Sequence, residues 1–384
     1  MEKTPCYVVD LEKFDKNAQS IQKAFRRSWG SNIRLGYSIK TNHLPFLLSH
    51  AKRHEFYAEA VSNEEYEYAA SQGYDLKNII FNGPQKEYGI LKKAIQGGSL
   101  VNLDNFQDIE MVEQIGLELG YENISVGLRF NFDLESECRG ETGLIDGISR
   151  FGICIENGDL EKAIGRLRDK GCTVAGLHVH YTTSTRSAEV YRAISKKVVE
   201  VIDKYGLKSD IKYIDLGGGF WGGRELPGKP STEEYSHTIA DTLRECISPE
   251  DVQLILEPGS SLLSTVAFYI TKVMNTRDIK GKRFVTMDGS LLDVNPLMRE
   301  RELDYSIYSS KSRNVLSKQI ICGGTCLESD RMIHLEEHGE LCAGDLVKIH
   351  NTGAYTISFN DCFINSPPYV YLKEKNKYIL IREK

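Results

Sequence analysis

Four segments of the chain place chemically capable side chains at or directly after the end of a short apolar run. These positions are Lys40 after residues 33–39, His178 and His180 at the end of residues 174–179, Gly217–Gly219 after residues 213–216, and Glu257 after residues 253–256. Together they offer an amine, two imidazole rings, free backbone amides and a carboxylate. Because the histidines are two residues apart, both rings lie on one side of an extended strand.

Each of these groups alone is more often structural than functional. A lysine at a strand end is usually a solvated cation, and a glycine run is usually a tight turn. The histidines could bind a metal or lie in the core, and Glu257 could cap the next element. Brought together, however, the groups match the needs of pyridoxal 5'-phosphate (PLP). That cofactor requires an amine for its aldehyde, amides for its phosphate, a carboxylate for its pyridine nitrogen and a flat partner for its ring.

Eight strand-like runs alternate with amphipathic, helix-like stretches between about residues 30 and 260. The runs are 33–39, 56–58, 78–81, 100–103, 125–130, 174–179, 213–216 and 253–256, and the helical patterns include 63–72, 106–116, 160–170, 188–204 and 232–246. Eight strands close a (β/α)8 barrel, the TIM barrel, whose reactive groups lie at the carboxyl ends of the strands. The pattern therefore predicts an α/β barrel that gathers the four segments at one mouth.

The residue pattern changes after about residue 265, where Gly, Asn and Asp interrupt runs of β-branched and aromatic residues. This predicts a mostly β C-terminal domain, a sandwich or a barrel, into which the strand-like run 5–9 could pair. We expect an N-terminal strand and helix in residues 1–28 that join the β domain. The PLP-binding barrel would comprise residues 29–265, and the C-terminal β domain residues 266–384.

The composition narrows the class of protein. With 54 acidic and 48 basic side chains in 384 residues, the formal charge of −6 argues against a nucleic-acid partner. The sequence lacks an apolar run of about 18 residues and a secretory leader, so we expect no membrane partner and a cytoplasmic location. Nine cysteines without framework spacing suit free thiols, and Cys322 and Cys326 lack zinc-ligand spacing, so no metal is expected.

Seven short motifs occur in a characteristic order. They are Tyr37-Ser-Ile-Lys40-Thr-Asn42, Ser149-Arg-Phe-Gly-Ile153, Gly176-Leu-His-Val-His180, Asp215-Leu-Gly-Gly-Gly219, Glu257-Pro-Gly259, the stretch from Cys326 to Asp330, and Gly353-Ala-Tyr355. In this order the chain resembles, over nearly its whole length, the fold-type III PLP-dependent decarboxylases. This group contains the diaminopimelate, ornithine and carboxynorspermidine decarboxylases and is related to alanine racemase.

The resemblance implies a role for each matching residue near the cofactor ring. Lys40 would be catalytic and would carry the PLP aldehyde as a Schiff base, His180 would stack on the pyridine ring, and Glu257 would pair with the pyridinium nitrogen. Glu59 and Arg129 match further residues that line the pocket. The cofactor phosphate would be bound by backbone amides and hydroxyl groups of Thr183, Gly218, Gly219, Gly259, Ser260 and Tyr355.

Cys326 matches a catalytic cysteine that acts across a dimer interface in the family. A thiol there could return a proton after carbon dioxide leaves, whereas a buried structural cysteine is the alternative. A site shared by two chains implies a homodimer. The implied substrate-binding residues are Asn295, Glu328, Asp330 and Tyr355.

Two positions depart from the diaminopimelate decarboxylases, which usually bind the distal carboxylate of their substrate with arginine. This chain has Ser260 at one such position, and Asn295 stands roughly at the place of the second. Without these arginines, the cost of burying the distal carboxylate, several kcal/mol, would not be offset. This argues against diaminopimelate as the substrate.

The sequence therefore predicts a PLP-dependent carboxy-lyase acting on an amino acid or an amino-acid conjugate. We expect a substrate of the polyamine-precursor type or of the siderophore and secondary-metabolite type, with carbon dioxide and an amine as products. An amino-acid racemase on the same scaffold and a non-catalytic PLP-binding protein are the alternatives.

Overall fold

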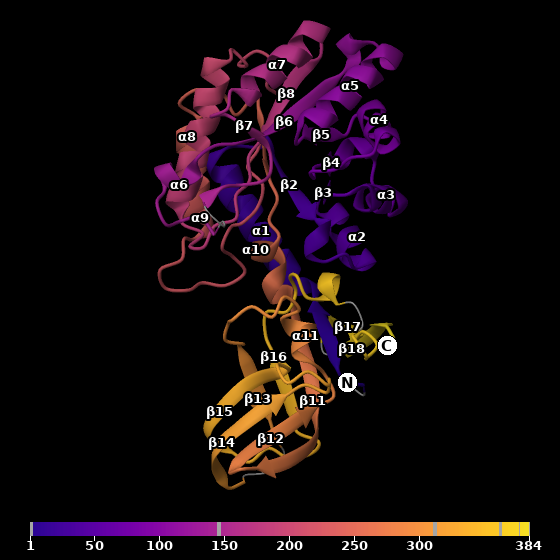
Figure 1. Ribbon diagram of the computed structural model, residues 1–384, viewed down its shortest axis with the longest axis vertical. Helices are drawn as coiled ribbons and strands as arrows, with labels where there is room; N and C mark the ends of the chain where they lie inside the picture. The colour runs from indigo at the N-terminus through magenta and orange to yellow at the C-terminus, as the bar shows by residue number, and fades with distance from the viewer. Residues whose placement is uncertain (1–2, 144–146, 310–312, 361–362, 376, 384) are drawn as a thin grey trace. The chain divides into compact units, whose positions relative to one another are not determined.

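The computed structural model describes residues 3–143, 147–309, 313–360, 363–375 and 377–383 (Figure 1). The chain forms two compact units. One comprises Ala18–Ser261, and the other combines Met1–Asn17 with Leu262–Lys384. The expected domain boundaries at residues 28 and 265 stay predictions.

The first unit is built on a closed parallel barrel. Its strands, in spatial order, are β2 (Ile33–Ser38), β3 (Tyr57–Ala60), β4 (Ile79–Phe81), β5 (Leu100–Leu103), β6 (Ser125–Asn131), β8 (Thr173–His178), β9 (Tyr213–Asp215) and β10 (Gln253–Leu256). Pairing of β10 with β2 and of β5 with β6 closes the ring. The predicted TIM barrel is thus confirmed. A short strand β7 (Ile153–Cys154), which the sequence did not indicate, pairs with β6 outside the ring.

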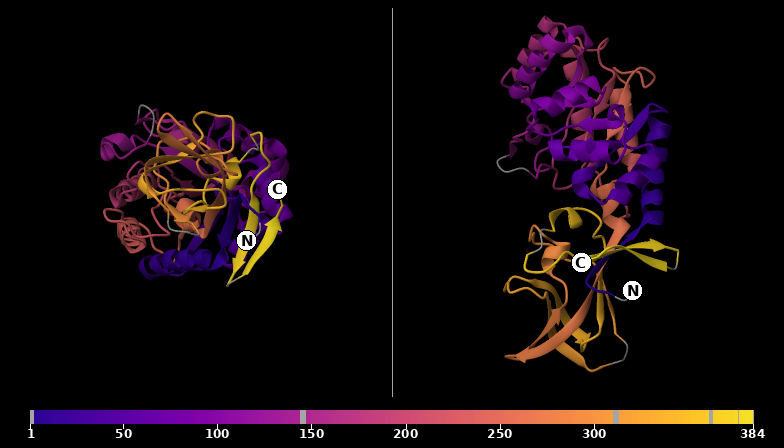
Figure 2. Two further views of the ribbon diagram at one scale, coloured as in Figure 1. Left: turned by 90° about the horizontal axis from the view of Figure 1, so that it is seen from below. Right: turned by 90° about the vertical axis from the view of Figure 1, so that its right-hand side faces the viewer.

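Helices surround these strands (Figures 1 and 2). The long ones are α1 (Leu11–Ser28), α2 (Pro45–Arg53), α3 (Asn63–Ser71), α4 (Tyr88–Gln96), α5 (Phe106–Leu119), α7 (Asp159–Lys170), α8 (Ala188–Lys204) and α9 (Thr232–Leu243), and a short one is α6 (Leu134–Glu137). A further short helix, α10 (Ser260–Leu263), follows β10. Within the described residues, no helix is both long and apolar enough to span a bilayer.

Tyr213 fills the barrel interior below the mouth. Its ring packs with Ile80 and Ile255 in one apolar cluster, and its hydroxyl donates to Asn102 Oδ1 at 2.9 Å. A Cβ added at Gly176 would lie 2.0 Å from the Tyr213 ring, so glycine on the neighbouring strand β8 makes room for this side chain. The filled interior gives the polar groups above it a solid floor.

The second unit is a mostly β structure that includes the N-terminal strand, as predicted. Strand β1 (Cys6–Asp10) lies between β11 (Ala267–Ile279), antiparallel, and β17 (Tyr369–Glu374), parallel. The other elements of this unit are β12 (Lys282–Met287), α11 (Leu291–Val294), β13 (Tyr305–Tyr308), β14 (Val315–Cys322), β15 (Arg331–Gly339), β16 (Leu346–Ile349) and β18 (Lys377–Arg382). In the part of the chain that is described, its strands join in one nine-stranded sheet.

Replacing Gly176 with alanine tests the filled interior. We expect Gly176→Ala to lower the free energy of unfolding by about 1–3 kcal/mol, because the added methyl group would overlap the Tyr213 ring. Urea unfolding measures this. Gly165→Ala in α7 is the matched control, since nothing lies near its added Cβ and alanine favours a helix by up to about 1 kcal/mol. Equal stability of both variants would contradict the steric explanation.

Candidate active site

Lys40 lies at the carboxyl end of the barrel, in a 3-10 turn (Ile39–Thr41) directly after β2. Its Nζ is 2.6 Å from Oε2 of Glu59 on β3, whose side chain is only 1% exposed. Ser38 Oγ donates to the same oxygen. Burial acts to raise the pKa of Glu59, but the charge and hydrogen bond of Lys40, together with the hydrogen bonds of Ser38 and Asn82, outweigh burial, so the net shift is downward. Glu59 is therefore ionised and holds the amine.

Asn82 connects this ion pair to Glu257. Its Nδ2 donates to Glu59 Oε1 at 3.2 Å and to Glu257 Oε1 at 2.6 Å. Asn102 Nδ2 donates to Asn82 Oδ1 at 2.8 Å, which fixes the orientation of the Asn82 amide. Lys40 and Glu257 therefore belong to one continuous polar cluster.

Two further buried groups, Asp215 and His178, lie beside Glu257. Asp215 on β9 and His178 on β8 are paired in the register of the two strands. One ring nitrogen of His178 and one carboxylate oxygen each of Asp215 and Glu257 lie within 4.8 Å of one another. Burial, followed by the nearby charges of Asp215 and Glu59, raises the pKa of Glu257 well above its usual range. Burial likewise raises the pKa of Asp215 to about 7. The pKa of His178 is lowered by burial and by Arg129, so its ring is neutral.

His180 contacts the run Gly217–Gly219 that follows β9. Gly218 N donates to His180 Nδ1 at 3.3 Å. Burial lowers the pKa of His180 to about 3, so this ring is neutral as well. Gly217 and Gly219 adopt positive φ angles of 61° and 94°, and a Cβ at Gly218 would lie 2.3 Å from Glu257 O. Only glycine allows the loop to pass this close to the end of β10.

The remaining predicted barrel residues belong to neighbouring strand ends and loops. Arg129 on β6 is buried and forms a 3.1 Å ion pair with Asp104. Thr183 follows His180 in the loop after β8, and its buried Oγ1 has no partner among the described residues. Gly259 is buried, and Ser260 begins α10.

Three of the other predicted residues lie in the turn between β14 and β15 of the β unit. Cys326 is exposed, and Glu328 is exposed with a 3.3 Å contact to Arg331. Asp330 is buried, and its carboxylate is surrounded by donors of its own unit. These donors are Ser290 Oγ, Leu291 N, Thr325 N and Thr325 Oγ1.

Asn295 and Tyr355 lie elsewhere in the same unit. The Asn295 side chain bonds the backbone of Arg299 at both ends of its amide, with Nδ2 donating to Arg299 O at 2.7 Å. Tyr355 is half-buried and has a positive φ of 55°, a sparsely populated conformation for a bulky residue.

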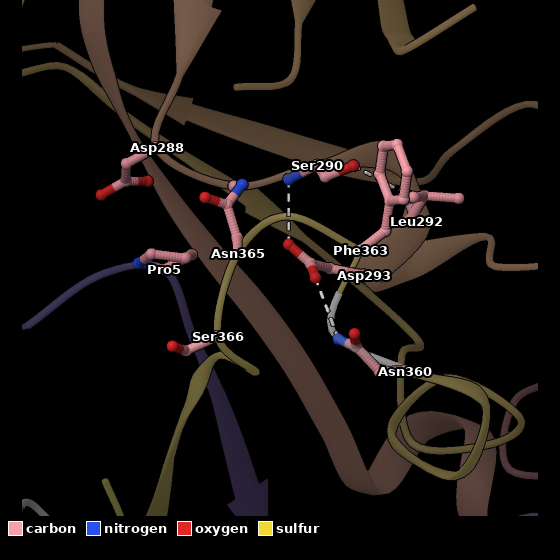
Figure 3. A pocket seen from close by; sticks show the side chains of 10 residues that line it. Pro5, Asp288, Ser290, Leu292, Asp293, Asn360, Phe363, Asn365 and Ser366 are labelled. Atoms are coloured by element: carbon pink, nitrogen blue, oxygen red, sulfur yellow. Dashed lines mark hydrogen bonds between the residues drawn. The ribbon is translucent and has the colours of Figure 1, made fainter. Parts of the chain in front are cut away.

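A small pocket in the β unit, of about 20 Å³, contains two further carboxylates, Asp288 and Asp293 (Figure 3). Asp293 accepts hydrogen bonds from Ser290 N and Asn360 Nδ2, both at 2.9 Å, and from the Tyr269 hydroxyl. Asp288 accepts three more, two at 2.8 Å on Oδ1 and one from Thr4 Oγ1 on Oδ2. These carboxylates are satisfied by neighbouring donors, and the pocket has little more room than one water molecule needs. We interpret them as structural.

The comparisons with known proteins agree with the fold. Residues 11–264 match the family model for the pyridoxal-dependent decarboxylase, pyridoxal binding domain, and the chain belongs to this family. It is a PLP-dependent amino-acid decarboxylase, a carboxy-lyase with a small-molecule amino-acid substrate. The comparisons favour this class over a racemase and over a non-catalytic PLP-binding protein.

Relatives resemble the chain over almost its whole length. Diaminopimelate decarboxylase from Helicobacter pylori is 26% identical over 100% of this chain and 93% of its own, and the Bacillus subtilis enzyme is 26% identical over 99% and 89%. A crystal structure of the Helicobacter pylori enzyme complexed with L-lysine has a TM-score of 0.83 at 25% identity, covering 100% and 94% of the two chains. These relatives give no support to the siderophore and secondary-metabolite types expected from the sequence.

The residues at the barrel mouth fit PLP. An amine and a buried carboxylate lie in one cluster, and neutral His180 offers a flat ring. Gly218 and Gly219 form a close backbone approach that no larger residue could make, as a phosphate-binding loop requires. The orphaned Thr183 hydroxyl offers a further polar group. The donor set therefore meets each requirement of the cofactor.

Sequence reasoning missed two residues of the cluster, Asn82 and Asp215. Asn82 follows a three-residue strand and bonds partners 23 and 175 residues away, so no local pattern marks it. Asp215 was noted only as the first residue of the motif Asp215-Leu-Gly-Gly-Gly219 and was given no role. Its position as the last residue of a buried strand was the available signal.

The buried carboxyl groups predict how stability depends on pH. In the cofactor-free protein, Asp215 and Glu257 have raised pKa values, and the pair retains at least one proton in the folded state that ordinary carboxyl groups release near pH 4. At these two carboxyl groups the folded state therefore binds more protons than the unfolded state between about pH 4 and pH 7, whereas the neutral rings of His178 and His180 bind fewer. The contribution of these carboxyl groups to stability should fall as the pH rises through this window, on the order of 1–3 kcal/mol, while the two histidines contribute in the opposite direction.

We expect the stability of Glu257→Gln relative to the wild type to rise with pH in this window, because the amide removes one of the two carboxyl groups whose contribution falls. Chemical unfolding of the cofactor-free protein across this pH range measures the effect. Exposed Glu250→Gln is the control and should follow the wild type. A difference between Glu257→Gln and the wild type that does not change with pH would contradict the assignment.

Proposed function

We propose that Lys40 binds PLP covalently and that the barrel mouth removes the α-carboxylate of an amino acid. The observation that supports this most strongly is the continuous line of contacts from Lys40 through Glu59 and Asn82 to Glu257. It joins an amine and a proton-binding carboxylate in one cluster, as the two ends of a pyridoxal ring require.

Each of the barrel residues would then make a different contact with the PLP ring or with Lys40. When bound, PLP supplies an electron sink for the pair left by the breaking bond between Cα and the carboxylate. Glu257 keeps a proton at the pyridine nitrogen, and neutral His180 packs against the ring face. Glu59 accepts a hydrogen bond from Lys40 Nζ and orients the amine. Arg129 lines the mouth.

The phosphate group would be bound by backbone amides and hydroxyl groups. We assign this role to the backbone of Gly218, Gly219, Gly259 and Ser260, the Thr183 hydroxyl and Tyr355. Gly217 and Gly219 have positive φ angles that other residues rarely adopt, and the absence of side chains lets an anion approach the loop closely.

Two substrate classes follow from different observations. Diaminopimelate is the first candidate, because relatives carrying that name match nearly the whole chain. The second is an amino acid without a distal carboxylate, such as a polyamine precursor. Ser260 and Asn295 favour it, since neither can form the bidentate charged pair of an arginine, and the Asn295 amide is engaged on Arg299.

A substrate panel tests the function and separates these classes. Diaminopimelate, lysine, ornithine and arginine are incubated with the holoenzyme, and mass spectrometry scores the loss of carbon dioxide. We expect carbon dioxide from at least one of them, and release from diaminopimelate alone would establish the first candidate. Lys40→Ala should lose both turnover and the borohydride-reducible bond to PLP, because no amine remains for the aldehyde. A covalent bond that survives in Lys40→Ala would refute the assignment of Lys40.

We further propose that the enzyme is a homodimer in which Cys326 of one chain returns a proton to the product bound by the other. For Cys326→Ala we expect carbon dioxide release to continue while the yield of amine falls and transaminated by-products appear, because the proton donor is lost. Product analysis by mass spectrometry measures the ratio, with Cys246→Ala as the thiol control. An unchanged ratio would make Cys326 structural.

A further inference from the structure

The assigned roles leave Asp215 and His178 unused, although they share the most deeply buried part of the cluster. Asp215 is fully buried and His178 is 2% exposed. Asp215 Oδ1 accepts the Gly217 amide at 2.9 Å, whereas Oδ2 and both His178 nitrogens have no partner among the described residues. A buried carboxylate oxygen without a donor costs free energy, so its place beside Glu257 requires an explanation.

We propose that Asp215 and Glu257 share a single proton, which makes Asp215 a positioning residue for Glu257. The inference rests on the proposed role of Glu257 at the ring nitrogen. The proton satisfies Asp215 Oδ2 and one Glu257 oxygen at once, while the Asn82 amide occupies Glu257 Oε1 at 2.6 Å. Glu257 is thereby held from two sides and can face the ring nitrogen without turning. Neutral His178, adjacent to Asp215 in the β8–β9 register, covers the pair without adding a charge.

The charges around the pair support one shared proton rather than two free anions. The titratable groups that interact electrostatically with Asp215, Glu257 or His178 are Lys40 after β2, Glu59 from β3, Lys86 after β4, Arg129 from β6, His180 after β8 and the phenol of Tyr213 from β9. The three cations in this set each contact another acid, at Glu59, Asp108 and Asp104 respectively. Two adjacent carboxyl groups in a buried site ionise in coupled steps. Burial raises the pKa of both members, in agreement with this geometry.

Two substitutions at Asp215 separate sharing of a proton from a need for negative charge. Asp215→Asn keeps the shape and offers a permanent N–H donor to Glu257 but cannot ionise. Asp215→Leu removes the hydrogen bond. The readouts are the PLP dissociation constant against pH and the 15N chemical shift of the ring nitrogen in labelled PLP bound to the holoenzyme. Ile214→Val, at the neighbouring buried position of β9, controls for general destabilisation of the strand.

For the wild type we expect PLP affinity to weaken above the pH at which the shared proton leaves, by up to about tenfold per pH unit. Asp215→Asn should lose this alkaline weakening and keep the 15N shift of a protonated ring nitrogen. Asp215→Leu should move that shift toward the neutral form, with kcat reduced by roughly tenfold or more and KM changed little. Ile214→Val should match the wild type in both readouts.

Other outcomes would overturn the inference. If Asp215→Asn behaves like Asp215→Leu, Glu257 needs the charge of Asp215 and not a shared proton. If Asp215→Leu matches the wild type in both readouts, Asp215 is only structural. Either result leaves the proposed function intact as long as Lys40 still forms the reducible bond and the wild type still releases carbon dioxide, so the two failures are distinguishable.

Discussion

The active end of the barrel depends on burying three carboxyl groups, Glu59, Asp215 and Glu257, around one lysine. All three are nearly inaccessible to water. Like charges at close range in a poorly solvated interior cannot all persist, so some of the groups must bind protons. Glu59 ionises because Lys40 is 2.6 Å away, and the other two have raised pKa values. Burial therefore favours a proton-bearing group in hydrogen-bonding contact with Glu257.

The backbone around the cluster follows from the same constraint. Gly36 on β2 lies between Glu59 and Glu257, and an added Cβ there would lie 3.1 Å from Ile80 Cδ1 and 3.4 Å from both acidic side chains. Below them, Tyr213 occupies the space that Gly176 leaves open. This packed interior contributes to the burial that shifts the pKa values of the carboxyl groups. Packing in the lower barrel therefore influences the proton affinity of the carboxyl groups at the mouth.

The sequence was sufficient for the barrel but not for the connections within its mouth. Buried parallel strands are continuous apolar runs, so residues 100–103 and 253–256 could be recognised with the bounds that β5 and β10 have in the structure. Lys40 and Glu257 were visible because strand ends mark the active face. Asn82 was not, since its function lies in two hydrogen bonds to distant strands and asparagine after a strand is ordinary in loops. The contribution of Cys326, Glu328 and Tyr355 to the site stays a prediction.

The degree to which a buried carboxylate is satisfied distinguishes structural acids from functional ones in this chain. Asp293 and Asp330 in the β unit accept several hydrogen bonds each from nearby donors, so nothing further is needed to stabilise them. Asp215 is at least as deeply buried but leaves one oxygen without a donor among the described residues. A protein that needed Asp215 only for folding would gain stability by satisfying or replacing it. Keeping it beside Glu257 is therefore best understood as a requirement of the chemistry at the ring nitrogen.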